Sequence, residues 1–132
     1  MTKDTPIESV MTVLPYTVGT DQTIEYAQRL MVEHHIRHLP VLRGSSLEGI
    51  VSERDLALAA GFDGVDPGTA TVEEAMMPVP YTVGRKASLG EVVQEMADRK
   101  IGSALIVHDH KVAGIFTVAD AVALFARMLH GA

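Results

Sequence analysis

The sequence of 132 residues contains no cysteine and no tryptophan. The missing thiols exclude disulfides, cysteine nucleophiles and the usual structural zinc sites. Aromatic residues make up only 5% of the chain, too few for the stacking platforms on which single-strand binders hold bases. The formal charge is −6 and no basic run is present, which disfavours long-range attraction to DNA or RNA. We therefore expect no nucleic-acid partner.

Long apolar runs and catalytic motifs are also missing. No stretch approaches the ~18 apolar residues of a membrane span, and Met1–Pro6 lacks the apolar core of a signal peptide. The chain has no Gly-x-Ser-x-Gly elbow and no Walker loop. These observations predict a soluble cytoplasmic protein that has no membrane partner, no catalytic residue and no enzymatic activity.

What the chain does contain is an internal repeat. Residues 10–58 align with residues 75–123 at a constant shift of 65, without a gap. Pro15–Gly19 and Pro80–Gly84 both read Pro-Tyr-Thr-Val-Gly. Because ~60 residues bury too little surface to be comfortably stable alone, we expect the two copies to pack on each other. A ligand is then expected at their junction.

Each copy follows the same plan of elements. In the first copy we expect a single turn at Ile7–Met11, an extended stretch, and a helix that starts at Ile24 and is capped by Asp21 or Thr23. A hairpin and a second helix from Glu53 to about Ala60 follow. The second copy adds a capping box at Ser88 and Glu91 and a longer last helix, Val118–Leu129. We place the first domain at residues 7–62, a linker at 63–70 and the second domain at 71–130.

The strongest local signal is the junction between the hairpin and the second helix. It reads Gly, two apolar residues, a hydroxyl residue, two variable positions and Asp, at 49–55 and again at 114–120. One interpretation is helix capping by Ser52 with Asp55 and by Thr117 with Asp120. The other is a ligand site, because a helix N-terminus beside a hydroxyl binds phosphate and an Asp accepts hydrogen bonds from a ribose diol. The duplication of the whole context favours the ligand.

With this repeated junction, the sequence resembles a tandem pair of CBS (cystathionine beta-synthase) domains, a Bateman module, over residues 7–130. The resemblance rests on 37–41, 49–56, 101–107 and 113–120. It implies an α/β fold of two β-α-β-β-α repeats around a pseudo-twofold axis, with two clefts that bind adenosine ligands. It also implies a homodimer formed through helices.

The resemblance assigns a role to each matching position. Asp55 and Asp120 would hold ribose hydroxyls, and the phosphate would be approached by Ser52, Arg54 and Thr117. The adenine pocket would be lined by Thr17, Val18, His38, Leu39, Pro40, Thr82, Val83, Ser103 and Ala104. Arg54 is matched by Ala119, and Arg37–His38 by Gly102–Ser103. The first copy is therefore expected to suit a polyphosphate, and the second a monophosphate or a neutral group.

The six histidines raise the question of a metal site. His34 and His38 have a helical metal-ligand spacing, and His108 and His110 share a turn, but neither pair has an evident third ligand. We expect no metal and no required cofactor.

The resulting hypothesis is a stand-alone regulatory module that binds AMP, ADP, ATP or an S-adenosylmethionine-like molecule. It would signal to an unknown protein partner by changed packing. The alternative is an interaction and dimerisation module whose clefts are empty. A third class, a nucleotide hydrolase, would need a general base that the sequence does not reveal.

Overall fold

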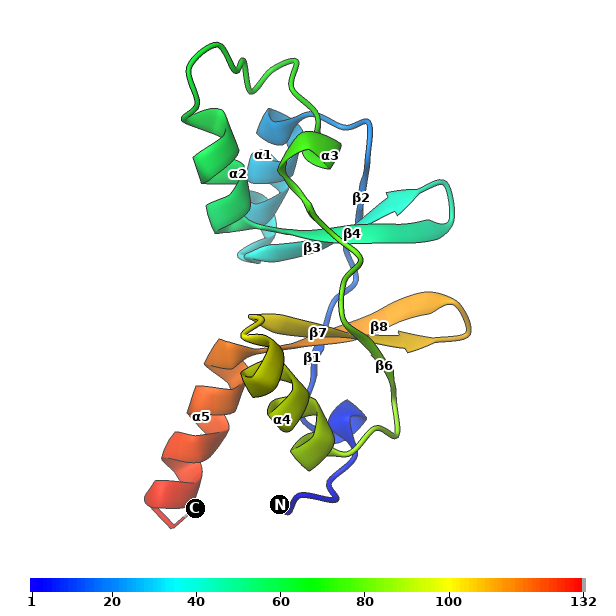
Figure 1. Ribbon diagram of the computed structural model, residues 1–132, viewed down its shortest axis with the longest axis vertical. Helices are drawn as coiled ribbons and strands as arrows, with labels where there is room; N and C mark the ends of the chain where they lie inside the picture. Colours follow the sequence, from blue (N-terminus) through cyan, green and yellow to red (C-terminus); the bar gives the residue numbers. More distant parts are fainter. Residues whose placement is uncertain (132) are drawn as a thin grey trace. The chain divides into compact units, whose positions relative to one another are not determined.

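The computed structural model describes residues 1–131. Its contacts divide the chain into two compact units (Figure 1). Unit 1 combines Met1–Pro15 with the chain from Tyr81 onward, and unit 2 is Tyr16–Pro80. The units therefore differ from the two sequence repeats, because the first segment of each repeat, together with the residues before it, folds with the rest of the other repeat.

Unit 2 contains one four-stranded sheet with helices on one of its faces (Figure 1). The sheet order is β2-β3-β4-β5, in which β2 is parallel to β3 and the other pairs are antiparallel. The strands are β2 (Val18–Gly19), β3 (His38–Arg43), β4 (Ser46–Ser52) and β5 (Met77–Pro78). The helices are α1 (Ile24–His34), α2 (Glu53–Ala60) and α3 (Val72–Ala75).

Unit 1 repeats this arrangement with the sheet order β6-β7-β8-β1. Its strands are β1 (Thr12–Val13), β6 (Thr82–Gly84), β7 (Ser103–His108) and β8 (Lys111–Thr117). Its helices are the 3-10 turn η1 (Ile7–Ser9), α4 (Leu89–Arg99) and α5 (Val118–Leu129). The mixed α/β fold with two repeats is confirmed, and so are the bounds of both second helices.

The helix starts follow from local capping. Thr23 Oγ1 accepts a hydrogen bond from the Tyr26 N–H at 3.1 Å, so Thr23 is the cap of α1. Only half of the capping box expected at the start of α4 forms. Ser88 Oγ accepts from the Glu91 N–H at 3.2 Å, but within residues 1–131 the Glu91 carboxylate makes no return bond to Ser88.

Each unit has its own hydrophobic core. In unit 2 the fully buried side chains Leu39, Val51 and Leu56 come from β3, β4 and α2. In unit 1 Ile106 and Phe116 of β7 and β8 pack with Ile7 of the N-terminal segment. Burying these apolar side chains is what holds helices to sheet in each unit.

Candidate functional site

The repeated junction forms a complete capping box in both units. In unit 2 Ser52 Oγ accepts from the Asp55 N–H at 3.0 Å, and Asp55 Oδ2 accepts from the Ser52 N–H at 3.0 Å. In unit 1 Thr117 Oγ1 accepts from the Asp120 N–H at 3.2 Å, and Asp120 Oδ2 accepts from the Thr117 N–H at 2.9 Å. The capping interpretation of these residues is confirmed.

Capping leaves part of each side chain available. Asp55 and Asp120 are half-buried, and within residues 1–131 every hydrogen bond to their carboxylates goes to Oδ2. A carboxylate has about four acceptor positions on its two oxygens. Oδ1 of each residue therefore has no hydrogen-bond donor within residues 1–131, and its acceptor positions are not used by the cap.

The repeated glycine of the junction has a structural cause that the sequence did not reveal. A Cβ added at Gly49 would lie 2.6 Å from the Met77 carbonyl oxygen. A Cβ at Gly114 would lie 2.6 Å from Met11 Sδ and 2.7 Å from the Thr12 carbonyl oxygen. Both glycines make room for the short strands β5 and β1, which pair with β4 and β8. The recurrence of this glycine is therefore no argument for a ligand.

The strand register gathers the other candidate residues beside each junction. The β3–β4 pairing puts His38 opposite Ser52, and the β7–β8 pairing puts Ser103 opposite Thr117. The ends of the Pro-Tyr-Thr-Val-Gly stretches form β2 (Val18–Gly19) and β6 (Thr82–Gly84), on the other side of β3 and β7. Within each unit the junction and the proposed pocket wall are thus neighbours, and the Thr-Val stretch is separated from the junction by one strand.

Several side chains assigned to the adenine pocket lie in the interior of their own unit. Leu39 and Ala104 are fully buried and Val18 is 2% exposed. Pro40 is also buried. These four residues can contact a ligand only through their backbone, unless the core rearranges. The accessible candidates are the exposed Thr17 and Thr82 and the half-buried His38, Val83 and Ser103.

The charge near the two junctions differs as the sequence indicates. Arg54 follows directly in the first turn of α2, and the Glu53 N–H donates to the Arg37 carbonyl oxygen at 2.9 Å. Both arginine side chains are exposed, and within residues 1–131 neither pairs with a carboxylate. In unit 1 the equivalent backbone bond joins the Val118 N–H to the Gly102 carbonyl oxygen at 3.0 Å, and no arginine is present at either position.

A pair of equivalent tyrosines lies at the start of the Thr-Val stretches. The Tyr16 ring stacks on His34 with centroids 4.0 Å apart, and the Arg99 guanidinium lies 5.1 Å from the Tyr81 ring centroid. Burial, and then the nearby Glu95 carboxylate, raise the pKa of Tyr81 above its usual value. These contacts were not predicted from the sequence, although the shift of 65 relates His34 to Arg99 just as it relates the two tyrosines.

Among residues 1–131 no group of three or more His, Asp or Glu side chains is arranged to hold a metal ion. His108 Nε2 lies 3.1 Å from the Asp109 carboxylate instead. No helix in this part of the chain is both long and apolar enough to cross a membrane.

A family model described as "CBS domain" matches residues 7–61 and 72–127. The chain therefore belongs to the CBS domain family, and its two repeats form a CBS pair, a regulatory module.

Similar proteins include both small CBS proteins and parts of enzymes. Hypoxic response protein 1 of Mycobacterium tuberculosis is 32% identical over 78% of this chain and 73% of its own length. The CBS domain-containing protein YhcV of Bacillus subtilis is 32% identical over 86% and 81%. Inosine-5′-monophosphate dehydrogenase of Korarchaeum cryptofilum is 35% identical over 79% of this chain but only 21% of the enzyme.

Two solved structures bear on ligands. The CBS pair of protein MJ0100, in complex with 5′-methylthioadenosine and S-adenosyl-L-methionine, has a TM-score of 0.81 and 26% identity, covering 94% of this chain and 98% of its own. Hypoxic response protein 1 with two coordinated zinc ions has a TM-score of 0.75 and 28% identity, covering 90% and 98%. Members of this fold thus bind adenosine-type molecules in one case and zinc in another.

Proposed function

We propose that this CBS pair is a regulatory module that binds an adenine nucleotide of the AMP, ADP or ATP type. The observation that carries this proposal is the pair of Ser/Thr-x-x-Asp junctions, whose carboxylates each keep Oδ1 available. The MJ0100 pair, which has the same fold and holds two adenosine derivatives, supports the same chemistry. In this proposal Asp55 and Asp120 bind ribose hydroxyls, and Ser52 and Thr117 approach the phosphate or its replacement.

The two junctions would differ in the ligand group they accept. Arg54 and Arg37 add two unpaired positive charges at the N-terminus of α2, where the helix dipole already favours an anion. Ala119 and Gly102 take these two places in unit 1. We therefore propose a polyphosphate at the unit 2 junction, and a monophosphate or an uncharged substituent such as a thioether at the unit 1 junction.

The second candidate is an interaction module whose junctions hold no nucleotide. It is favoured by the complete capping boxes, which account for both aspartates without a ligand. An enzymatic role is the weakest choice because CBS pairs are regulatory modules and the sequence contains neither a Gly-x-Ser-x-Gly elbow nor a Walker loop. A cytoplasmic location stays a prediction from composition.

The partner that we propose is a second copy of this chain. Val118, Val122, Phe125 and Leu129 follow heptad spacing on α5 and are 50–68% exposed. Alanines flank this stripe, and the two charged residues of the helix, Asp120 and Arg127, lie on the opposite side of the heptad. Because no charge would have to leave water, two copies of this stripe can pack against each other. We propose a homodimer that pairs α5 with its counterpart.

The nucleotide proposal is tested by titrating the protein with AMP, ADP, ATP, S-adenosylmethionine and methylthioadenosine in a calorimeter. Asp55→Ala and Asp120→Ala should each weaken binding at their junction about ten- to hundredfold, the scale of lost charge-assisted bonds. The matched control is Glu74→Ala. Its carboxylate completes a capping box with Thr71 at the start of α3, outside both junctions, so it should leave the affinity unchanged.

Two outcomes would contradict the proposal. If both aspartate variants bind with wild-type affinity, the assignment of Asp55 and Asp120 to the ligand is wrong. A protein whose melting temperature responds to none of the five molecules would favour the interaction module, since a ligand at a hundred times its Kd stabilises the fold by about 2.7 kcal/mol.

A further inference from the structure

The first five residues close the N-terminal end of α4. The Leu89 N–H donates to the Thr5 carbonyl oxygen and the Gly90 N–H to the Lys3 carbonyl oxygen, both at 2.8 Å. The first N–H groups of a helix have no partner inside the helix, so these carbonyls act as an external cap. The segment is itself a turn, in which the Thr5 N–H donates to the Thr2 carbonyl oxygen at 3.1 Å. We call Met1–Thr5 the strap.

The linker between the repeats does the same for α1 in unit 2. The Ile24 N–H donates to the Ala70 carbonyl oxygen and the Glu25 N–H to the Pro67 carbonyl oxygen, both at 2.9 Å. This segment is also a turn, closed by the Ala70 N–H on the Asp66 carbonyl oxygen at 2.8 Å. The shift of 65 relates Thr5 to Ala70, so the strap and the end of the linker are equivalent parts of the repeat.

At the point where each segment crosses its helix, one of the two residues is glycine. A Cβ added at Gly90 would lie 2.9 Å from Lys3 Cβ and 3.0 Å from the Lys3 carbonyl oxygen. In unit 2 a Cβ added at Gly68 would lie 3.2 Å from Glu25 Oε2. The shift of 65 relates Lys3 to Gly68 and Gly90 to Glu25. Each unit thus has a glycine near this crossing, but only Gly90 meets the backbone and Cβ of the crossing segment, whereas Gly68 meets the end of the flexible Glu25 side chain.

The two segments are held with different strength. The linker packs Val65 and Ala70 against the core of unit 2. Met1 to Asp4 of the strap are exposed, and within residues 1–131 Lys3 and Asp4 take part in no ion pair. The first fully buried side chain after the strap is Ile7. Backbone bonds with little apolar burial are typical of segments that open locally at low cost.

The strap also forms one wall of an apolar groove. The groove lies between α4 and α5, has a volume of about 310 Å³, and is lined by Met1, Thr2, Lys3, Leu89, Phe116, Leu124, Phe125 and Met128, among others. Phe125 belongs at the same time to the exposed stripe of α5. Removal of the strap would therefore enlarge the apolar surface of α5.

We propose that Met1–Thr5 is a strap that opens and closes the groove between α4 and α5, with the crossing of Lys3 over Gly90 defining the closed state. Opening breaks the two bonds to the strap carbonyls, frees the N-terminus of α4 and uncovers Leu89 and Phe116 next to the stripe on α5. The strap thereby sets how much apolar surface unit 1 presents. This inference does not depend on nucleotide binding.

Native-state hydrogen exchange of the unmodified protein tests the opening directly. The amides of Leu89 and Ile24 donate to equivalent carbonyls, so each serves as the control for the other. Opening of the strap predicts that the Leu89 amide exchanges at least about tenfold faster than the Ile24 amide, after correction for intrinsic rates. Equal protection of the two amides would overturn the proposal.

Substitutions test the crossing. Gly90→Ala should displace Lys3, speed exchange of the Leu89 amide further and increase binding of an apolar dye such as ANS. Gly102→Ala is the control, because a Cβ there meets nothing within 4 Å. The double substitution Lys3→Gly with Gly90→Glu recreates the residue pair of unit 2 and should restore slow exchange, whereas Gly90→Glu alone should not. Failure of this rescue, or an unchanged Gly90→Ala variant, would show that the crossing does not define the closed state.

Discussion

The two units have the same fold, but their surfaces differ in net charge and in exposed apolar side chains. Unit 1 has seven basic and seven acidic residues, and unit 2 has four basic and ten acidic, so the whole formal charge of −6 belongs to unit 2. The apolar stripe on α5 has no counterpart, because the equivalent positions on and after α2 are Glu53, Ala57, Ala60 and Gly64. The two units therefore share their sheet order, whereas unit 2 carries the acidic surface and unit 1 carries the apolar stripe, a face suited to association.

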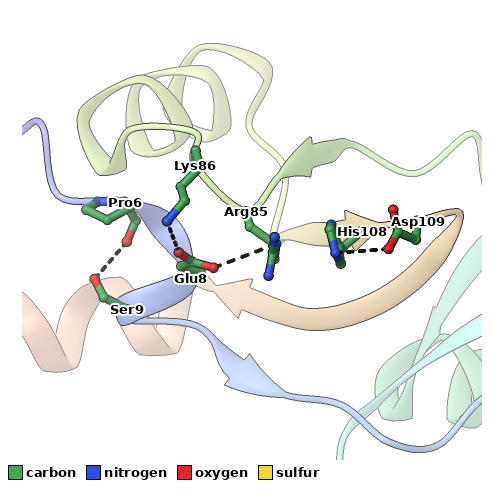
Figure 2. A network of polar contacts seen from close by, with 7 residues as sticks. All are labelled: Pro6, Glu8, Ser9, Arg85, Lys86, His108 and Asp109. Atoms are coloured by element: carbon green, nitrogen blue, oxygen red, sulfur yellow. Dashed lines mark hydrogen bonds and ion pairs between the residues drawn. The ribbon is translucent and has the colours of Figure 1, made fainter.

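Equivalent positions also show how contacts can be kept while partners change. Glu8 in η1 and Glu73 in α3 are related by the shift of 65. Glu73 pairs with Arg43 of the β3–β4 hairpin. Glu8 instead accepts a bond from Lys86 Nζ at 2.5 Å, with Arg85 Nε 3.8 Å away, both from the turn before α4 (Figure 2). Both units thus have a carboxylate at this position, in the short helix that folds with the other repeat, but the cation that pairs with it comes from a different element in each unit.

The largest effect that would sharpen this comparison is on self-association. Val122→Glu places a carboxylate in the middle of the α5 stripe, where Val122 is 61% exposed. It should weaken the homodimer at least tenfold, because burying an unpaired charge costs well over the ~1.4 kcal/mol of a tenfold change. Sedimentation equilibrium, referred to the 14.2 kDa chain, measures it.

The matched control for that experiment lies in unit 2. Leu58 on α2 is 59% exposed, so Leu58→Glu introduces the same charge at a similarly exposed apolar position outside the stripe. It should leave association unchanged. Equal dissociation by both variants would mean that unit 2 shares the interface, and a stable Val122→Glu dimer would exclude the α5 stripe.

The next largest effect concerns the two cores. Phe116 and Val51 occupy equivalent positions on β8 and β4, and both are fully buried. Phe116→Ala should lower the free energy of unfolding by about 3–5 kcal/mol and Val51→Ala by about 2 kcal/mol, since the larger side chain leaves the larger cavity. Urea denaturation followed by circular dichroism measures both. A cost for Val51→Ala as large as that for Phe116→Ala would contradict a ranking by buried volume.

The sequence predicted those parts of the fold that carry a repeating signal. The helices Glu53–Ala60 and Val118–Leu129 and both long hairpins follow from apolar spacing and capping residues. The exchange of segments between the repeats was not predicted. β1 and β5 have two residues each, which is too short for any periodicity to show, and their partners lie far away in the sequence.

The candidate site was predicted in part. The hydroxyl and carboxylate of each junction and the neighbouring His38 and Ser103 do lie close together in their units. The burial of Leu39 and Ala104 was not predicted, although both residues open continuous apolar runs, 39–42 and 104–107, which are typical of a strand buried on both faces. The sequence also suggested a ligand-related reason for Gly49 and Gly114, where the cause is the close approach of β5 and β1.

The smallest expected effect is the pH dependence that the Glu8 carboxylate gives to the stability of unit 1. The hydrogen bond from Lys86, and then the charges of Lys86, Arg85 and His108, hold the pKa of Glu8 below its ordinary value of 4.5, although burial opposes the shift. Folded protein thus binds this proton less readily than unfolded protein. The resulting stabilisation is present above pH ~4.5 and is lost as the pH falls through the lower folded value.

Glu8→Gln removes that contribution. Its melting temperature should lie slightly below that of the wild type near neutral pH, and the difference should vanish in acid below the lowered pKa of Glu8 and shrink in high salt. Glu33→Gln is the control, because within residues 1–131 Glu33 makes no ion pair, and it should show no such pH dependence. A difference that persists in acid would mean that Glu8 stabilises η1 by packing. In that case the pairs of Glu8 with Lys86 and Arg85, drawn in Figure 2, would not contribute to holding the N-terminal segment in unit 1.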